Sequence, residues 1–185
     1  MPGHVCHWWL AYSFDNPLRR LVHDPARILQ GLVLPGNTVI DIGCGFGFFT
    51  LAMAKMVGDE GRVIALDIQR QMLDRTRARA RRRRLEGRID FHLANQERLG
   101  VTNAVDFALA FWMVHETVDR AAFFSEVVTI LKPEARLMIA EPRMHVSSAT
   151  FRETIDIARL TGLEPCEERR VRFSRATVLR LSRGE

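Results

Sequence analysis

Three glycines and an aspartate have the types and spacing of a nucleotide-binding loop. Gly43, Gly45 and Gly47 follow a short β-branched run, and glycine permits a sharp turn and the close approach of a ligand. The spacing is GxGxG rather than the GxGxxG of dinucleotide-binding loops. Asp41 stands two positions before the first glycine, where a carboxylate repels a pyrophosphate but suits a cationic centre. The pattern therefore favours a nucleoside that carries an amino acid.

Two more polar residues follow the next apolar runs of the chain. Asp67 lies twenty residues beyond Gly47, where a carboxylate can accept hydrogen bonds from both hydroxyls of a ribose. Asn95 lies in the next loop and can face an adenine edge. Because ligands of open α/β sheets bind at the carboxyl ends of the strands, we expect these residues to share one site with the glycines.

His115 and Glu116 come soon after the apolar run Val105–Phe111 and are candidates for catalysis. The unperturbed pKa of histidine lies near neutrality, so His115 can serve as a general base toward a hydroxyl or amine. An equal alternative is that both residues only hydrogen-bond the loop that follows. Glu141 and His145, after a later apolar run, are further candidates to line the same pocket.

The elements that must position these residues alternate along the chain. We expect strands at 37–42, 62–67, 89–93, 105–111 and 136–141, and helices at 48–57, 69–85, 120–131 and 147–161. Such alternation is typical of βαβ units and a parallel sheet. The last two runs, 163–171 and 176–181, are too close for a crossover helix and predict an antiparallel hairpin. The expected fold is therefore α/β and Rossmann-like, with a seven-stranded, mostly parallel sheet and helices on both faces.

The N-terminal 35 residues differ in character from the rest. Asp24 and Pro25 predict the start of a helix that runs to about Val33. Upstream, the aromatic-rich segment 7–14 can act as a lid, pack on the sheet or form a homodimer contact. We expect one domain over residues 1–185, with 1–35 as a helical cap and 36–185 as the core.

Composition limits the class of protein. The chain has 185 residues, 47% of them hydrophobic and 26% charged, which suits one globular domain. No apolar stretch approaches the roughly 20 residues of a membrane-spanning helix. The cysteines Cys6, Cys44 and Cys166 contain no CxxC pair, so we expect a cytoplasmic protein without disulfides or a metal site.

Eight arginines between Arg75 and Arg88 account for much of the net charge of +5. A solvated helix face is the usual origin of such a run. The alternative is a nucleic-acid contact, which the general scarcity of lysine in this chain makes less favoured.

In this order, the motifs resemble those of the class I S-adenosylmethionine-dependent methyltransferases, over roughly residues 25–182. The stretch Asp41–Gly47 (DIGCGFG) resembles the first motif of the family, and Asp67 matches its ribose-binding acid. Asn95 falls where many members have an aspartate near adenine. Val105–Glu116 resembles the fourth-strand motif, and 131–133 (LKP) resembles the LKPGG turn, with Glu and Ala replacing the glycines.

The resemblance implies that S-adenosylmethionine is the cofactor and that a small molecule accepts its methyl group by in-line displacement. In this reading His115 and Glu116 are the catalytic candidates, and Phe111, Trp112 and Met113 form a wall at the reactive end of the cofactor. The predicted cofactor-binding residues are Asp41, Gly43, Cys44, Gly45, Gly47, Asp67, Ile68, Asn95, Gln96, Phe111, Trp112 and Met113. Two alternatives stay open: an RNA methyltransferase that uses the basic helix Arg75–Arg88, and a non-catalytic S-adenosylmethionine-binding protein.

Overall fold

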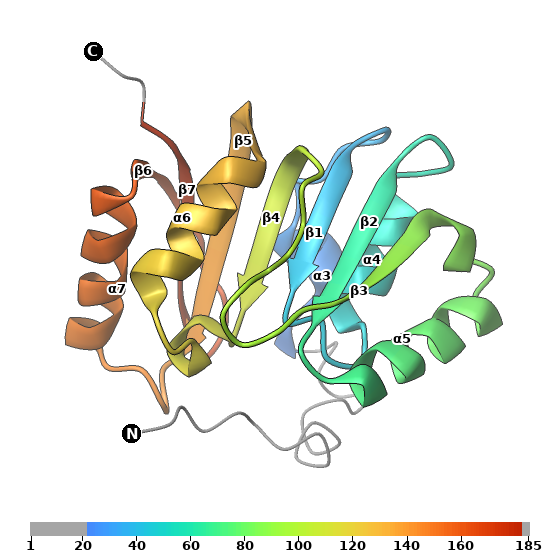
Figure 1. The fold of residues 1–185 in the computed structure, drawn as a ribbon, viewed down its shortest axis with the longest axis horizontal. Helices are drawn as coiled ribbons and strands as arrows, with labels where there is room; N and C mark the ends of the chain where they lie inside the picture. Colours follow the sequence, from blue (N-terminus) through green and yellow to red (C-terminus); the bar gives the residue numbers. More distant parts are fainter. Residues whose placement is uncertain (1–21, 183–185) are drawn as a thin grey trace.

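The computed structural model describes residues 22–182, so the aromatic segment 7–14 lies outside the described residues. These residues form a central sheet with helices on both of its faces (Figure 1). The strands are β1 (Thr38–Ile42), β2 (Arg62–Asp67), β3 (Ile89–Leu93), β4 (Val105–Phe111), β5 (Leu131–Pro142), β6 (Leu163–Glu168) and β7 (Ser174–Leu181). The helices are α3 (Pro25–Ile28), α4 (Phe48–Met56), α5 (Arg70–Arg82), α6 (Arg120–Ile130) and α7 (Ser148–Leu160), with 3-10 turns η1 (Glu86–Arg88) and η2 (Val114–Glu116).

The seven strands lie in the order β3-β2-β1-β4-β5-β7-β6. Strands β1 to β5 run parallel to one another, and β7 pairs antiparallel with both β5 and β6. The predicted fold class and terminal hairpin are therefore confirmed. The chain reverses its direction of progress through the sheet between β1 and β4, and such a switch point is where open α/β sheets bind ligands.

Two separate apolar layers hold the helices to the sheet. One layer joins α3, α4 and α5 to residues such as Val39, Phe107 and Met138. The other joins α6 and α7 to the opposite side chains of the same strands, such as Ile40, Ala108 and Leu137. Neighbouring residues of one strand enter different layers because side chains alternate across a sheet. The strands consequently read as continuous apolar runs, as expected for a sheet buried on both faces.

Three helices begin at the kind of capping residue that favours a helix N-terminus. Asp24 accepts a hydrogen bond from the Ala26 N–H at 3.1 Å. Asp119 and Ser147 do the same for Ala122 and Thr150. These caps fix the points where α3, α6 and α7 leave their loops.

Several predicted boundaries were wrong. The helix expected to reach Val33 ends at Ile28 and continues as turns. Strand β5 begins at Leu131 instead of 136, because Leu131 pairs with Val105 and the Lys132 ammonium lies 2.8 Å from the Asp106 carboxylate. The LKP segment is therefore strand and not a turn before it.

The arginine-rich helix shows the predicted division of faces. Met72, Leu73, Thr76 and Ala80 of α5 are buried against the sheet. The consecutive arginines 81–84 are exposed, and the Arg81 guanidinium pairs with Glu86. No helix within residues 22–182 is long and apolar enough to cross a membrane.

Candidate functional site

The glycine loop lies between β1 and α4, and its backbone conformation requires glycine. Gly43, Gly45 and Gly47 all have positive φ angles, of 72°, 52° and 76°, a region that disfavours residues with a Cβ. A Cβ on Gly43 would come within 3.0 Å of the Met113 side chain, and one on Gly47 within 2.5 Å of Thr76. A Cβ on Gly45 would meet no atom within 4 Å. Two glycines thus allow internal packing, and the third faces open space.

Neighbouring elements fix the loop through its backbone. The N–H groups of Gly43 and Cys44 donate to the Leu66 carbonyl of β2 at 2.8 and 2.9 Å. From α5, the Thr76 hydroxyl donates to the Gly45 carbonyl at 2.8 Å, and Arg79 donates to the Phe46 carbonyl at 2.6 Å. The arginine-rich helix therefore supports the loop as well as facing solvent.

The two aspartates occupy different places around this loop. Asp41 is 2% exposed and accepts a hydrogen bond from the Thr50 hydroxyl of α4. Asp67 accepts from the N–H groups of Gly45 and Gln69, both at 2.9 Å. Burial raises the pKa of Asp67 above its ordinary value, although bonds from Gln69, Gly45 and Ile68 oppose that rise. Asp67 thus joins the carboxyl end of β2 directly to the glycine loop.

The loop after β3 brings the adenine candidates to the same edge. The Ala94 N–H donates to the Asp67 carbonyl at 3.0 Å. The Asn95 side-chain oxygen accepts from the N–H groups of Glu97 and Arg98, at 2.9 and 2.7 Å, which makes an Asx turn. The Asn95 oxygen is therefore used within the loop, and its amide N–H groups can donate to other partners. Ile68 and Gln96 are exposed beside these residues in sequence.

The end of β4 carries the residues that were predicted to wall the reactive end of the cofactor. Phe111 is buried and Trp112 is half-buried. Trp112 has a φ of 61°, and its indole N–H donates to the Ser174 hydroxyl at 2.8 Å. His23, from the segment expected to be a cap, packs edge-on against the rings of Phe111 and Trp112 at 5.4 and 5.2 Å. These rings pack on one another, and the neighbouring Met113 side chain borders the glycine loop at Gly43.

His115 forms a dyad with Glu141, which is 1% exposed at the end of β5. One Glu141 oxygen accepts the Val114 N–H at 3.0 Å, and the other lies 2.5 Å from His115 Nδ1. Glu116 is 3.9 Å from His115 Nε2, and the His145 ring stacks on His115 at 6.1 Å. Burial alone lowers the pKa of His115, but the Glu141 hydrogen bond and charge, with Glu116, raise it above its usual value. The dyad orients the imidazole and favours its protonated form.

The structure adds supporting residues that sequence reasoning missed. Thr50, Thr76, Arg79 and Ser174 all hold a predicted site residue or the glycine loop. Each of them except Thr50 is more than 30 positions from its partner, so no local pattern marked it. Cys44 is buried, and its surroundings raise the pKa of the thiol chiefly by desolvation, so it is not poised as a nucleophile.

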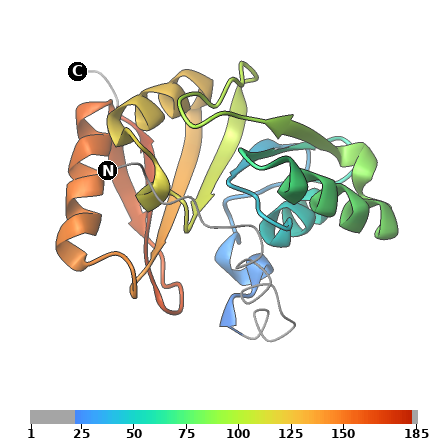
Figure 2. The same cartoon turned by 60° about the horizontal axis from the view of Figure 1, so that its bottom comes forward.

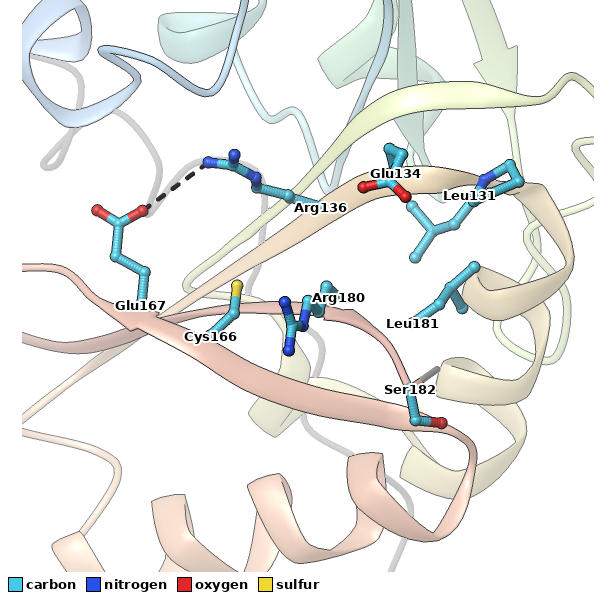
Figure 3. A pocket seen from close by; sticks show the side chains of 9 residues that line it. Leu131, Glu134, Arg136, Cys166, Glu167, Arg180, Leu181 and Ser182 are labelled. Atoms are coloured by element: carbon cyan, nitrogen blue, oxygen red, sulfur yellow. Dashed lines mark ion pairs between the residues drawn. The ribbon is translucent and has the colours of Figure 1, made fainter. Parts of the chain in front are cut away.

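A cavity of about 600 Å³ lies away from these residues, at the amino ends of the parallel strands, near the start of β5 and the end of β7 (Figure 3). Its arginines already have partners: Arg136 lies 4.0 Å from Glu167, and Arg180 lies 2.8 Å from Glu164. Because it lacks both the glycine loop and the His115 dyad, we assign the candidate site to the carboxyl edge.

A doubly wound sheet with a glycine loop after β1 and an acid after β2 defines a nucleoside-binding α/β protein. A family model described as "Methyltransferase domain" matches residues 34–163. The chain therefore belongs to this methyltransferase family, and the resemblance to class I S-adenosylmethionine-dependent methyltransferases is confirmed.

Two curated relatives have names that refer to quinone methylation. The chain is 32% identical over 110 residues to the ubiquinone/menaquinone biosynthesis C-methyltransferase UbiE of Hydrogenovibrio crunogenus, covering 59% of this chain and 43% of the relative. It is 30% identical over 110 residues to the demethylmenaquinone methyltransferase of Lactobacillus johnsonii, covering 59% of this chain and 45% of the relative. The match thus spans less than half the length of these relatives.

Solved structures share the fold over nearly the whole chain. A SAM-dependent methyltransferase from Aquifex aeolicus has a TM-score of 0.86 at 24% identity, with 96% of this chain and 100% of the other covered. A structure from Methanococcus maripaludis described as a putative S-adenosyl-L-methionine-dependent methyltransferase has a TM-score of 0.81 at 16% identity, with 96% and 93% covered. At these identities the likeness concerns the fold.

Proposed function

We propose that this protein transfers the methyl group of S-adenosylmethionine to a small-molecule acceptor at the carboxyl edge of β1, β2, β4 and β5. The observation that carries the proposal is the joining of Gly45 to the Asp67 carboxylate at 2.9 Å, because it combines a loop open to a ligand with an acid suited to ribose. The His115–Glu141 dyad lies at the neighbouring strand ends. Membership of the methyltransferase family supports the same reaction.

The residues fit the cofactor in the following way. Asp67 would accept hydrogen bonds from the ribose hydroxyls, since each carboxylate oxygen has a second lone pair beyond the one used by the backbone. Asn95 would donate its free amide N–H groups to adenine. Asp41 would favour the cationic methionine part from beneath the loop, and Gly45 would let the backbone approach it.

On the acceptor side of the site, His115 can take up the proton that the acceptor loses. S-adenosylmethionine, when bound, provides an electrophilic methyl group on a sulfonium, so the acceptor must offer a nucleophilic atom in line with it. As the new bond to the methyl carbon forms and the carbon–sulfur bond breaks, the acceptor loses a proton. His115 would take that proton at Nε2, because Nδ1 is held by Glu141. Glu116, beside Nε2, would stabilise the resulting imidazolium.

The relatives favour a particular class of acceptor. One is named as a C-methyltransferase of ubiquinone/menaquinone biosynthesis, and the other is named as a demethylmenaquinone methyltransferase. We infer a quinone-related aromatic ring as the acceptor of this chain, methylated on carbon. The aromatic wall of Phe111 and Trp112 supports an apolar, planar acceptor.

Calorimetric titration with S-adenosylmethionine and its demethylated product tests the cofactor site. Asp67→Asn should weaken binding about 10–100-fold, because a hydrogen bond to a charged group contributes about 1.5–3 kcal/mol. Asp74→Asn, an exposed position on α5, is the matched control and should bind as the wild type does. Absence of binding by the wild-type chain would reject the proposal.

A methyl-transfer assay then separates the remaining classes. A panel of reduced quinone-related rings should yield methylated product, whereas a protein that only binds the cofactor would yield none. Retention of RNA that is lost when Arg81–Arg84 are neutralised would instead support a nucleic-acid substrate.

A further inference from the structure

Two loops project side by side at the carboxyl edge, beyond the candidate site (Figure 2). They connect β5 to α7 and β6 to β7, and each presents an exposed apolar side chain: Met144 is 89% exposed and Phe173 is 59% exposed. The Arg143 N–H donates to the Phe173 carbonyl at 2.9 Å, and Pro142 pairs with Ser174. The two apolar side chains are therefore held on one local surface.

The same loops are rich in arginine. Residues 143–147 and 169–175 contain no carboxylate and five arginines, namely Arg143, Arg169, Arg170, Arg172 and Arg175. Arg169 pairs with Glu167 at 2.7 Å. Within residues 22–182, no carboxylate lies in ion-pair distance of the other four. Arg143 and Arg175 donate only to backbone carbonyls, so the surface keeps its positive charge.

The backbone holds Phe173 outward at an energetic cost. Its φ of 59° lies in the left-handed region, which a bulky residue rarely adopts. The Ser174 N–H donates to the Val171 carbonyl at 3.1 Å and closes the turn, while Val171 itself is buried. The turn therefore buries its valine and exposes its phenylalanine, and the Arg172 guanidinium lies 5.7 Å from the exposed ring.

We propose that Met144, Phe173, Arg143, Arg170 and Arg172 form a docking patch for an anionic lipid surface. Exposed apolar side chains enter the boundary between headgroups and acyl chains, and adjacent arginines bind anionic headgroups. A second copy of this chain is a poor occupant because two such patches would bring like charges together. Nucleic acid would pair with the arginines, and a base could stack on the Phe173 ring, but it would leave the aliphatic Met144 side chain, 89% exposed, without an apolar partner.

The docking patch lies next to the His115–Glu141 dyad. His145 follows Met144, and its ring stacks on His115 of the dyad. A lipid surface bound at the patch would therefore lie beside the acceptor side of the candidate site. The docking inference does not depend on the proposed methyl transfer, because the patch is made of residues outside the cofactor and proton-transfer groups.

Vesicle sedimentation with the full chain tests the inference. Phosphatidylcholine vesicles that contain phosphatidylglycerol should retain the protein, pure phosphatidylcholine should retain much less, and added salt should weaken retention. Arg170→Gln and Arg172→Gln should each weaken binding about fivefold. Met144→Gln combined with Phe173→Asn should also reduce it, and asparagine tolerates the left-handed backbone at 173.

Matched controls come from the same kinds of residue elsewhere. Leu160→Gln, at an 88% exposed position at the far end of α7, and Arg82→Gln, on the exposed face of α5, should leave retention unchanged. Failure of anionic vesicles to retain the wild type, or equal retention of the patch variants, would overturn the inference. So would retention of single-stranded RNA, without vesicle binding, that the patch variants lose. Calorimetry with S-adenosylmethionine on the same variants should show unchanged affinity, which keeps this test separate from that of the cofactor site.

Discussion

The two halves of the candidate site are built differently. The half around β1 and β2 is held mainly through the backbone groups of the glycine loop: the N–H groups of Gly43 and Cys44 donate to the Leu66 carbonyl, and the Gly45 N–H donates to the Asp67 carboxylate. In the half around β4, β5 and β7, the candidate side chains bond to other side chains, as His115 does to Glu141 and Trp112 does to Ser174. We infer that the first half sets a constant geometry for a cofactor, whereas the second can change its chemistry by substitution of a few side chains.

The largest expected effect is on the acceptor half. His115→Ala should lower kcat about 100–10,000-fold, the usual contribution of a general base, while the affinity for S-adenosylmethionine stays unchanged. Steady-state kinetics and calorimetry measure the two quantities on one preparation. His145→Ala provides the comparison: it removes a stacked ring but not the dyad, so its kcat should fall less than tenfold. Equal losses for both variants would show that His115 acts only through packing.

The next effect separates packing from conformation in the cofactor half. Gly47→Ala should lower the free energy of unfolding by about 2–5 kcal/mol, because its φ is positive and its Cβ would overlap Thr76. Gly31→Ala has a similar φ of 75° but open space around the new Cβ, so it should lose only about 1–2 kcal/mol. Urea denaturation measures both. Equal losses of unfolding free energy would mean that only the positive φ angle matters, and that the close contact of Gly47 with Thr76 of α5 adds nothing.

A smaller change should appear in the pH profile of the acceptor half. His115 must be neutral to accept a proton, and the Glu141 hydrogen bond and charge raise its pKa, so kcat should rise with pH through a midpoint above the ordinary pKa of histidine. In Glu141→Gln the charge is lost but an acceptor remains for the Val114 N–H, so that midpoint should move to lower pH. Without the Glu141 charge, the burial of His115 lowers its pKa with less opposition, which also moves the midpoint to lower pH.

The control for this profile is a charge change that does not touch His115. Glu134→Gln, an exposed residue near the start of β5, should keep the wild-type midpoint. If Glu141→Gln also kept it, another group would control the rising limb and His115 would not be the base.

The difference between the halves also explains how much the sequence predicted. The loop Asp41–Gly47 and Asp67 were identified because strand ends and glycine spacing are local signals, and the structure brings them together. Glu141 and His145 were only candidates to line the pocket, since 26 residues separate Glu141 from His115 and no local pattern records their contact. Trp112 was predicted as a wall, but its bond to Ser174 spans 62 residues and follows from the pairing of β5 with β7.

The smallest expected effect tests whether α5 belongs to the cofactor half. Thr76→Val keeps the side-chain shape but removes the hydroxyl that donates to the Gly45 carbonyl, which should cost about 0.5–1.5 kcal/mol of stability. If the bond also sets the loop geometry, the binding free energy of S-adenosylmethionine should weaken by a similar amount, while kcat at saturating cofactor stays unchanged. Thr129→Val, which loses a hydroxyl that bonds its own helix on α6, controls for the loss of a hydroxyl. A fall in stability with full affinity would make Thr76 a packing residue, and the cofactor half would then depend on β1 and β2 alone.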